Sequence, residues 1–592
     1  SSAASDVYKR QIMGLGILQK NGDKLSVSGE SIKEVFALVT KGDGFYKDGS
    51  FIQHGDIPYT GSYGNVLVKG TSKILGILAN SKWNLPKDVT DSFVTNVNNA
   101  FIPLIEKGEM MPMVNGRSIS RATSTKTTGF GSPTMYNLLL VSEFADPSAN
   151  SQLKESVKYW LKENPAYYYT NARDFKDLLL TKQVMSDETI LGKEKPFLGS
   201  KLYGAMDRYV YARGDFSVGL SMYSNRISSF EAGNKENKRG WHTSDGMLYL
   251  FNQDQQYGEG YWPTIDPYRL PGTTVDTVKL ADEVNSFTTV RSSEKQVGGA
   301  TDGKNAAIGM ALNKAGTKNN GTVLPMDLKA QKSWFVFDDQ IVALGSGIQG
   351  TTSASIETVI ENRMLDSNST YQLLTNQGEV SSNGEQTMQA NEWLLLSSSQ
   401  KNQSIGYYFP QEETITLVKE QRTGKYSDIN EGFPNSQVYT ENYQKVLLNH
   451  GQKPIDEKYA YVLLPNATKQ GLENYAKQNR IEILSNEKAN QSVKDTVTGI
   501  TAANLWAANQ TVAGITFSHP ASVLLKEESN KAKVTVANPL QTNETLTLNF
   551  SKAVKTVIHA DENITISEDG RSAQVQTAGM TGGSSQLEVE WE

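Results

Sequence analysis

The spacing of the hydrophobic residues changes once along the chain, near Lys195–Pro196, and this change limits the folds that the chain can adopt. Before that point, apolar side chains recur at helical spacing in segments joined by short loops. Beyond it, apolar and polar residues alternate with a period of two, as in residues 275–280, 334–337 and 341–344. A helical region followed by antiparallel sheets is therefore predicted.

The length of 592 residues favours several domains, at roughly 100–200 residues each. We place a helical domain at residues 12–195, a large antiparallel β-sandwich domain at 196–515 and a small C-terminal β-sandwich at 516–592. The first helix is expected to begin at a capping box, Ser31-Ile32-Lys33-Glu34. Further helices are expected at 66–78, 89–105, 133–145, 151–163 and 172–184.

Composition excludes several kinds of site and partner. The chain has no Cys, which excludes disulfides, thiol nucleophiles and thiolate metal sites without fixing the compartment. Its 5 His leave little room for a polyhistidine metal site, and we expect no metal and no cofactor. No apolar run approaches the roughly 18 residues that span a bilayer, so no membrane span is expected. The formal charge of −6 argues against nucleic acid, and an anionic ligand would need a local basic cleft.

The densest functional signal is the Gly-rich and aromatic-rich stretch 43–65, which we expect to be a long loop between helices. Loops longer than about 12 residues are usually functional or disordered, and this one is too aromatic for disorder. His54 and Tyr63 can converge there as two proton-transfer groups, because an imidazole and a phenol can each act as acid or base. A capping loop in which both only satisfy hydrogen bonds explains the composition equally well.

Two further segments carry charged and amide groups. If their segment is helical, Arg117 and Arg121 share one face and form a positive patch suited to carboxylates or to the phenolate of Tyr63, although a solvated or salt-bridged pair is the commoner case. The segment 226–245 could orient an arginine through its acids and amides, but a turn-rich hairpin has the same composition.

Together these motifs resemble the polysaccharide lyase family that includes the bacterial hyaluronate, chondroitin AC and xanthan lyases. The resemblance extends over nearly the whole chain, and its motifs lie in the same order at 43–65, 115–121, 231–245, 261–274, 332–339, 361–363 and 450–451. It implies an incomplete α/α toroid followed by a large central β-sandwich and a smaller C-terminal β domain. It also implies β-elimination on a uronate-containing polysaccharide, which leaves a 4,5-unsaturated product.

The resemblance assigns roles to individual residues. Tyr63 matches the family's acid, and its base as well, with His54 as the other candidate base. Arg117 would favour ionised Tyr63, and Glu231 would hold that arginine in place. The residues expected to bind substrate are Arg121, Asn234, Asp43 and Gln53.

The N-terminus departs from the family pattern. Residues 1–11 do not resemble it, and the match resumes at about 12–18, so we expect a foreign segment on an N-terminally truncated chain. The family's carboxylate-neutralising Asn would fall near Ala4, so little or no lyase activity is expected of residues 1–592 alone. The resemblance implies a secreted or cell-surface monomer, although no signal peptide is visible.

Hyaluronate is the expected substrate, and chondroitin and xanthan are the alternative substrates. A polysaccharide-binding protein without turnover is a different class of function. A hydrolase with paired carboxylates is a third, because the chain has 64 Asp and Glu whose spatial pairing the sequence does not reveal.

Overall fold

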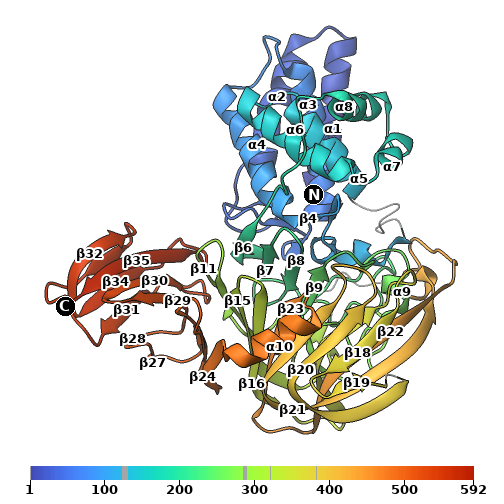
Figure 1. Cartoon of the computed structure of the whole chain (residues 1–592). Helices are drawn as coiled ribbons and strands as arrows, with labels where there is room; N and C mark the ends of the chain where they lie inside the picture. Colours follow the sequence, from blue (N-terminus) through green and yellow to red (C-terminus); the bar gives the residue numbers. More distant parts are fainter. Residues whose placement is uncertain (1, 123–130, 284–289, 320–321, 382) are drawn as a thin grey trace. The chain divides into compact units, whose positions relative to one another are not determined.

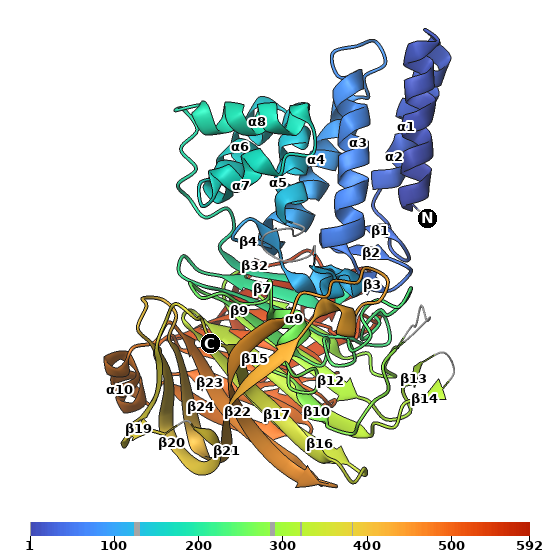
Figure 2. The ribbon, with the colours of Figure 1, turned by 90° about the vertical axis from the view of Figure 1, so that its right-hand side faces the viewer.

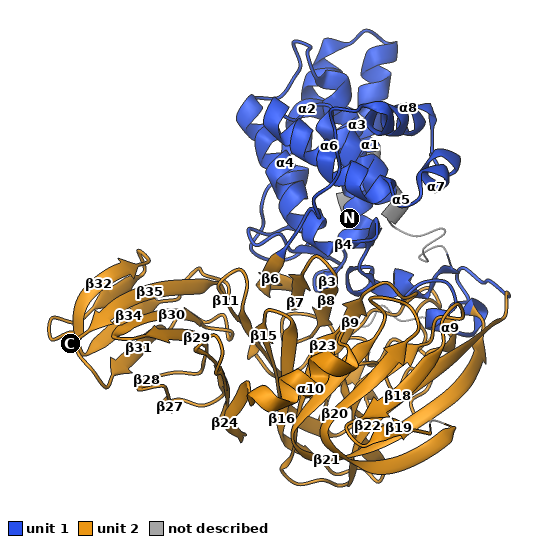
Figure 3. Cartoon of the chain, viewed as in Figure 1, with its two compact units in different colours: residues 1–198, 257–262, 426–436 blue, residues 199–256, 263–425, 437–592 orange. Residues whose placement is uncertain are grey.

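The computed structural model describes residues 2–122, 131–283, 290–319, 322–381 and 383–592. The chain divides into two compact units (Figure 3). The first unit contains residues 1–198, 257–262 and 426–436, and the second contains 199–256, 263–425 and 437–592. The predicted order of a helical region followed by sheets is confirmed.

The first unit is built mainly of helices. Its helices are α1 (Ser2–Leu18), α2 (Gly22–Phe36), α3 (Asn65–Leu78), α4 (Lys87–Phe101), α5 (Gly131–Ser142), α6 (Pro147–Leu161), α7 (Pro165–Thr170) and α8 (Phe175–Ser186). Helix α1 packs on α2 and α3, α3 packs on α5, and α5 packs on α6 and α8 (Figure 2). Fully buried Ile32, Phe93 and Val97 lie in its core, because apolar residues at helical spacing face one side.

The predicted capping box at Ser31 is wrong. Helix α2 begins nine residues earlier, at Gly22, where Asn21 accepts hydrogen bonds from the backbone N–H groups of Asp23 and Lys24 at 3.1 and 3.3 Å. Ser31 instead lies inside the helix and its hydroxyl donates to the Ser28 carbonyl at 3.1 Å. The buried residues of α2 extend the apolar face by two turns before Ser31, and packing of that face outweighs the local cap signal.

The second unit contains a four-stranded sheet and a large antiparallel sheet. The four-stranded sheet has the order β6 (Gly199–Tyr203), β7 (Arg208–Ala212), β8 (Ser217–Ser221) and β9 (Met247–Phe251). The 12-stranded sheet follows the path β10-β17-β22-β21-β23-β16-β15-β12-β11, with β18, β19 and β20 joined at β21. Strands β20, β21 and β22 lie side by side in it (Figure 1).

The bounds of the strands in this large sheet are β10 (Thr274–Asp276), β11 (Val297–Thr301), β12 (Ala306–Asn313), β15 (Leu328–Phe337), β16 (Gln340–Gly350), β17 (Ser355–Met364), β18 (Tyr371–Thr375), β19 (Gly378–Val380), β20 (Gly384–Ser398), β21 (Ile405–Gly424), β22 (Tyr439–Gln452) and β23 (Glu457–Pro465). The alternation at 334–337 and 341–344 predicts β15 and β16 correctly. The strand expected at 275–280 stops at Asp276, because its carboxylate accepts from the Val278 N–H at 3.1 Å and forms an Asx turn.

The C-terminal part of the second unit is a β-sandwich. One sheet has seven strands, β24 (Ile481–Glu487), β25 (Asn490–Asp495), β26 (Ile500–Leu505), β29 (Ala521–Glu528), β30 (Lys531–Ala537), β35 (Ser584–Trp591) and β32 (Val554–Ala560). The other has five strands, β27 (Gln510–Val512), β28 (Ile515–Phe517), β31 (Thr545–Phe550), β34 (Ser572–Gln576) and β33 (Ile564–Ile566). Residues from both sheets, including Phe517, Val523, Leu548 and Leu587, form one buried core.

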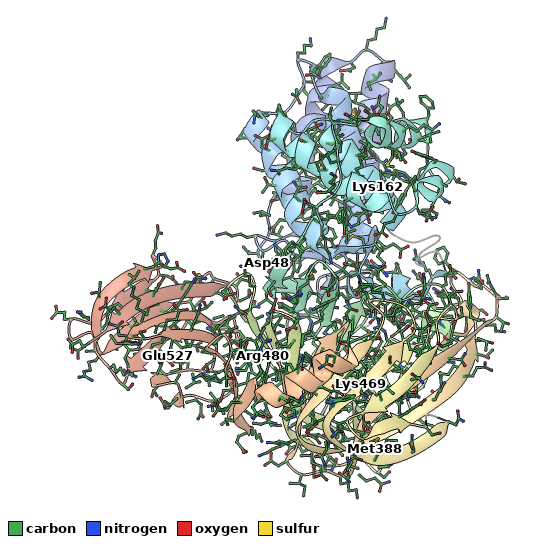
Figure 4. The ribbon with its side chains drawn as sticks, viewed as in Figure 1. Asp48, Lys162, Met388, Lys469, Arg480 and Glu527 are labelled. Atoms are coloured by element: carbon green, nitrogen blue, oxygen red, sulfur yellow. The ribbon has the colours of Figure 1, made fainter. Side chains whose placement is uncertain are left out.

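Two smaller elements also belong to the second unit. The hairpin β13 (Lys318–Asn319) and β14 (Thr322–Val323) stands apart from the large sheet. Helix α10 (Lys469–Gln478), which begins at the labelled Lys469 in Figure 4, leads into β24. Among the described helices of the whole chain, none has the length and apolar character needed to cross a membrane.

Candidate active site

The stretch 43–65 is not the irregular loop that the sequence predicts. It forms a small antiparallel sheet of β1 (Gly44–Phe45), β2 (Phe51–Gln53) and β3 (Ile57–Pro58), followed by a single π-helical turn, η1 (Thr60–Gly64). The fully buried rings of Phe45 and Phe51, which pair across β1 and β2, meet edge to face at 4.9 Å. Asp48, labelled in Figure 4, caps the β1–β2 turn by accepting from the Ser50 N–H at 2.8 Å.

His54 lies in the turn between β2 and β3, in a left-handed backbone conformation with φ of 56°. Asp43 holds this turn: one carboxylate oxygen accepts from the Gly55 N–H at 2.7 Å and the other from Gln53 Nε2 at 2.8 Å. Gln53 is buried, whereas His54 is exposed. Asp43 and Gln53, predicted to bind substrate, therefore contact each other and support His54, and their contact with substrate stays a prediction.

The structure brings His54 and Tyr63 together. Their ring centroids lie 5.0 Å apart, and the Tyr59 ring contacts both, at 5.7 Å from His54 and 4.8 Å from Tyr63. Tyr59 is fully buried, whereas Tyr63 on η1 is partly exposed. Single π-helical turns are rare and occur often at functional sites. Two groups able to move protons thus reach solvent beside a buried aromatic ring.

The predicted pairing of Arg117 with Tyr63 is present, and it includes Tyr59. Arg117 is buried on the 3₁₀ turn η4 (Gly116–Ser120), where Nη2 donates to the Tyr63 hydroxyl at 3.4 Å. The Tyr59 hydroxyl accepts from Arg117 Nη1 at 3.1 Å and from its backbone N–H at 3.2 Å. Gly116 has φ of 53°, and a Cβ there would come within 2.2 Å of the Tyr59 ring.

Sequence reasoning missed Tyr59. It lies in the same motif as His54 and Tyr63, but nothing local marks its contact with Arg117, which is 58 residues away. The one available signal is the glycine before Arg117, which is typical of a close approach between backbone and another group.

Arg117 and Arg121 do not share a face. The 3₁₀ turn ends at Ser120, and Arg121 has an extended backbone with φ of −91° and ψ of 135°. Its guanidinium lies over the ring of Phe433, 4.2 Å from the centroid. The expectation of one positive face is wrong because it requires α-helical geometry, which this segment lacks.

A polar network supports the π-helical turn. Asn65, the first residue of α3, donates to the Gly61 carbonyl and to Thr134 Oγ1, both at 2.8 Å. Its own Oδ1 accepts from Asn137 Nδ2 at 2.9 Å. The amide of Asn65 is thus committed to contacts inside the protein, where it fixes the backbone that carries Tyr63.

Tyr46 offers a contrast within the same stretch. Burial, with smaller contributions from Asp43 and Asp48, raises the pKa of Tyr46 to about 12. Its hydroxyl donates to the Gly42 carbonyl at 2.7 Å. The raised pKa makes Tyr46 unsuited to act as a base.

Glu231 and Asn234 belong to the second unit. Glu231 is buried, and its carbonyl accepts from Asn237 Nδ2 at 2.8 Å. Asn234 is exposed in a two-residue turn with Lys235, where both residues have positive φ, 53° and 59°, and Gly233 pairs with Glu236. The hairpin interpretation of this segment is confirmed locally, and the functional roles of Glu231 and Asn234 stay predictions.

Comparison with known proteins decides the family. Residues 6–159 match the polysaccharide lyase family 8 N-terminal alpha-helical domain, 198–476 the super-sandwich domain and 482–547 the C-terminal beta-sandwich domain. Hyaluronate lyase of Thermasporomyces composti is 32% identical over 96% of this chain and 72% of its own length. The chain belongs to polysaccharide lyase family 8.

Other family 8 relatives agree with this assignment. Hyaluronate lyase HylB of Enterococcus faecalis is 51% identical over 98% of this chain, and the chain spans 58% of that relative. The solved Paenibacillus xanthan lyase is 33% identical with a TM-score of 0.91, covering 99% of this chain and 56% of its own. The Streptomyces coelicolor chondroitin AC lyase in complex with chondroitin sulphate is 31% identical with a TM-score of 0.86. The match covers 100% of this chain and 78% of that lyase. The predicted helical domain, large β-sandwich and small C-terminal β-sandwich are thus confirmed as family 8 domains.

Proposed function

We propose that the protein is a lyase that cleaves a uronate-containing glycosaminoglycan by β-elimination, with hyaluronate as the preferred substrate. The observation that carries the proposal is the partly exposed Tyr63, whose ring lies 5.0 Å from the His54 ring and whose hydroxyl accepts from Arg117 Nη2 at 3.4 Å. Membership of family 8 and the relatives named hyaluronate lyase support it. Chondroitin and xanthan are the alternative substrates, because lyases of these polymers have the same fold.

The reaction needs one proton removed and one delivered. A base takes the proton from the uronate carbon next to the carboxylate, and the electron pair of that C–H bond forms the 4,5 double bond as the glycosidic C–O bond breaks. The leaving oxygen then takes a proton. In our proposal ionised Tyr63 is the base and, once protonated, the acid, while His54 is the other candidate base. The two proton transfers balance, so water is not consumed.

Arg117 has two tasks in this proposal. Its guanidinium stabilises the ionised phenol, because an opposite charge within a few ångström favours the charged form. Its hydrogen bonds to both Tyr59 and Tyr63 also hold the two rings in a fixed relation. A guanidinium suits this task because it presents several donors in one plane.

We also propose that the protein acts outside the cell, on the surface or secreted, because a polymer of this kind does not enter a cell intact. The polymer is its expected partner, and a monomer is the expected state. Neither a cofactor nor a metal is required by the proton transfers above.

The test is incubation of the intact protein with hyaluronate, chondroitin and xanthan, followed by ultraviolet absorbance of the unsaturated product. We expect absorbance to rise fastest with hyaluronate and to stay flat for the Tyr63→Phe variant. A protein that binds these polymers without producing absorbance would be a binding protein, and the proposal would be wrong.

A further inference from the structure

Residues 426–436 interrupt the sheet region in sequence but belong to the first unit. Two fully buried residues anchor them there. Asn430 Nδ2 donates to Ser120 Oγ at 2.9 Å, although the two residues are 310 positions apart, and the Tyr426 hydroxyl donates to the Glu259 carbonyl. The Asn430 side chain also accepts from the Phe433 N–H at 2.8 Å. The backbone of Phe433 is thus held by a buried side chain.

The hydrogen bonds of Asn430 extend to the candidate active site. Ser120 Oγ accepts from Asn430 and donates to the Arg117 carbonyl at 2.8 Å. A continuous chain of hydrogen bonds therefore runs from the Phe433 backbone through Asn430 and Ser120 to Arg117. The position of Phe433 is coupled to the turn that carries the arginine of the site.

Phe433 itself is 54% exposed, in contrast to its anchors. Single exposed apolar side chains are common, so exposure alone indicates little. What distinguishes this ring is the Arg121 guanidinium, which lies 4.2 Å from its centroid in a cation–π arrangement. An apolar ring and a positive charge are thus presented together at the surface.

We propose that Phe433 lies beside Arg121, the arginine already expected to bind substrate, and completes a subsite for one sugar unit of an acidic polysaccharide. The ring would pack on the apolar C–H face of a pyranose, and the guanidinium would pair with the carboxylate of a uronate. This inference rests on the proposed function and extends it, because it adds Phe433, which no proton transfer uses, to the binding role expected of Arg121. A neutral polysaccharide lacks the carboxylate and is not expected to bind.

The first experiment compares Phe433→Ala with Phe175→Ala in steady-state cleavage of hyaluronate. Phe175 is 77% exposed on α8 of the same unit and serves as the matched control. We expect Phe433→Ala to raise KM about tenfold with little change in kcat, since it removes binding shared by ground and transition states. Phe433→Tyr keeps an aromatic ring and should restore KM. An unchanged KM for Phe433→Ala, or an equal rise for Phe175→Ala, would overturn the subsite.

The second experiment separates this inference from the proposed function. Binding of hyaluronate is measured in the Tyr63→Phe background, with and without Phe433→Ala or Arg121→Gln. Weaker binding in both double variants supports the subsite even if the wild-type protein gives no unsaturated product. Equal binding, together with normal product formation by the wild type, overturns the subsite alone. A wild type that binds no acidic polymer overturns both.

Discussion

The buried Tyr59 hydroxyl accepts two hydrogen bonds from Arg117, one from the side chain at 3.1 Å and one from the backbone at 3.2 Å. Tyr59→Phe leaves both donors without this acceptor, at a cost of about 1–3 kcal/mol for a buried group. We expect kcat on hyaluronate to fall about tenfold, because Arg117 is less well held against Tyr63. Tyr46→Phe is the control, since its hydroxyl bonds only to a carbonyl outside the ring cluster. Equal kinetics of the two variants would contradict a positioning role for Tyr59.

Tyr63→Phe removes the phenol while keeping the ring that packs on His54 and Tyr59. Loss of general acid–base catalysis costs about 10²–10⁴-fold in rate. Turnover should therefore fall by that factor, whereas binding of hyaluronate, measured by affinity electrophoresis, should stay close to that of the wild type. More than a tenth of normal turnover would remove Tyr63 from its proposed role.

Arg117→Ala removes the positive charge beside Tyr63. Because that charge favours the phenolate, we expect the pH–rate profile to move to higher pH. Arg121→Ala should raise KM and leave the profile in place, since Arg121 contacts Phe433 instead. Arg117→Lys keeps the positive charge, so its pH–rate profile should lie closer to that of the wild type than the profile of Arg117→Ala does. An unmoved profile for Arg117→Ala would mean that this arginine only positions groups.

Asp43→Ala tests whether Asp43 supports His54 or binds substrate. The variant removes the carboxylate that accepts from the Gly55 N–H and from Gln53 Nε2, so the left-handed turn at His54 is expected to loosen and kcat to fall. Asp48→Ala, which uncaps the neighbouring β1–β2 turn, is the matched control. A rise in KM with unchanged kcat would instead favour direct binding by Asp43.

Lys332 in the second unit is expected to make the stability of the protein depend on pH. The fully buried ammonium donates to the Gly272 carbonyl at 3.0 Å and to Thr274 Oγ1 at 2.6 Å. Burial lowers the pKa of Lys332 from 10.5 to about 7, with Asp245 acting weakly in the opposite direction. Nearby His450, whose pKa burial and Lys332 lower to about 4, stays neutral above pH 7.

The direction in which the free energy of unfolding changes with pH follows from proton binding by Lys332. Below pH 7 the folded and unfolded forms both carry the Lys332 proton, and the cost of burying the charge is fully present. Between pH 7 and about 10 the unfolded form keeps the proton that the folded form has lost, so the free energy of unfolding rises with pH. Lys332→Met should remove this rise, which calorimetric unfolding at pH 7 and pH 9 can measure. The same rise in wild type and variant would contradict the assignment.

Much of the fold can be predicted from periodicity, whereas the site can be predicted only in part. Helices α3 and α4 and strands β15 and β16 follow from apolar spacing, because each is long enough for the pattern to repeat. The three strands of residues 43–65 have two or three residues each, too few for alternation to be visible.

The features that periodicity does not predict depend on contacts between residues far apart in the sequence. The π-helical turn under Tyr63 depends on Asn65 binding Thr134, 69 positions away. The sequence neighbours of Phe433 would assign its segment to the sheets. Contacts such as Asn430–Ser120 show that it belongs to the helical unit. Residue types and spacing singled out His54, Tyr63 and Arg117 because their chemistry is distinctive, but they cannot show which tyrosine supports the others.

The most direct test of the account is the mass of the products that the intact protein releases from hyaluronate. Elimination consumes no water, so we predict that each newly formed non-reducing end is lighter by one water molecule than the corresponding saturated sugar. Tyr63→Phe should release almost no product of this mass. Products that have gained a water molecule at every cleavage would show hydrolysis, and would contradict the assignment of Tyr63 as acid and base.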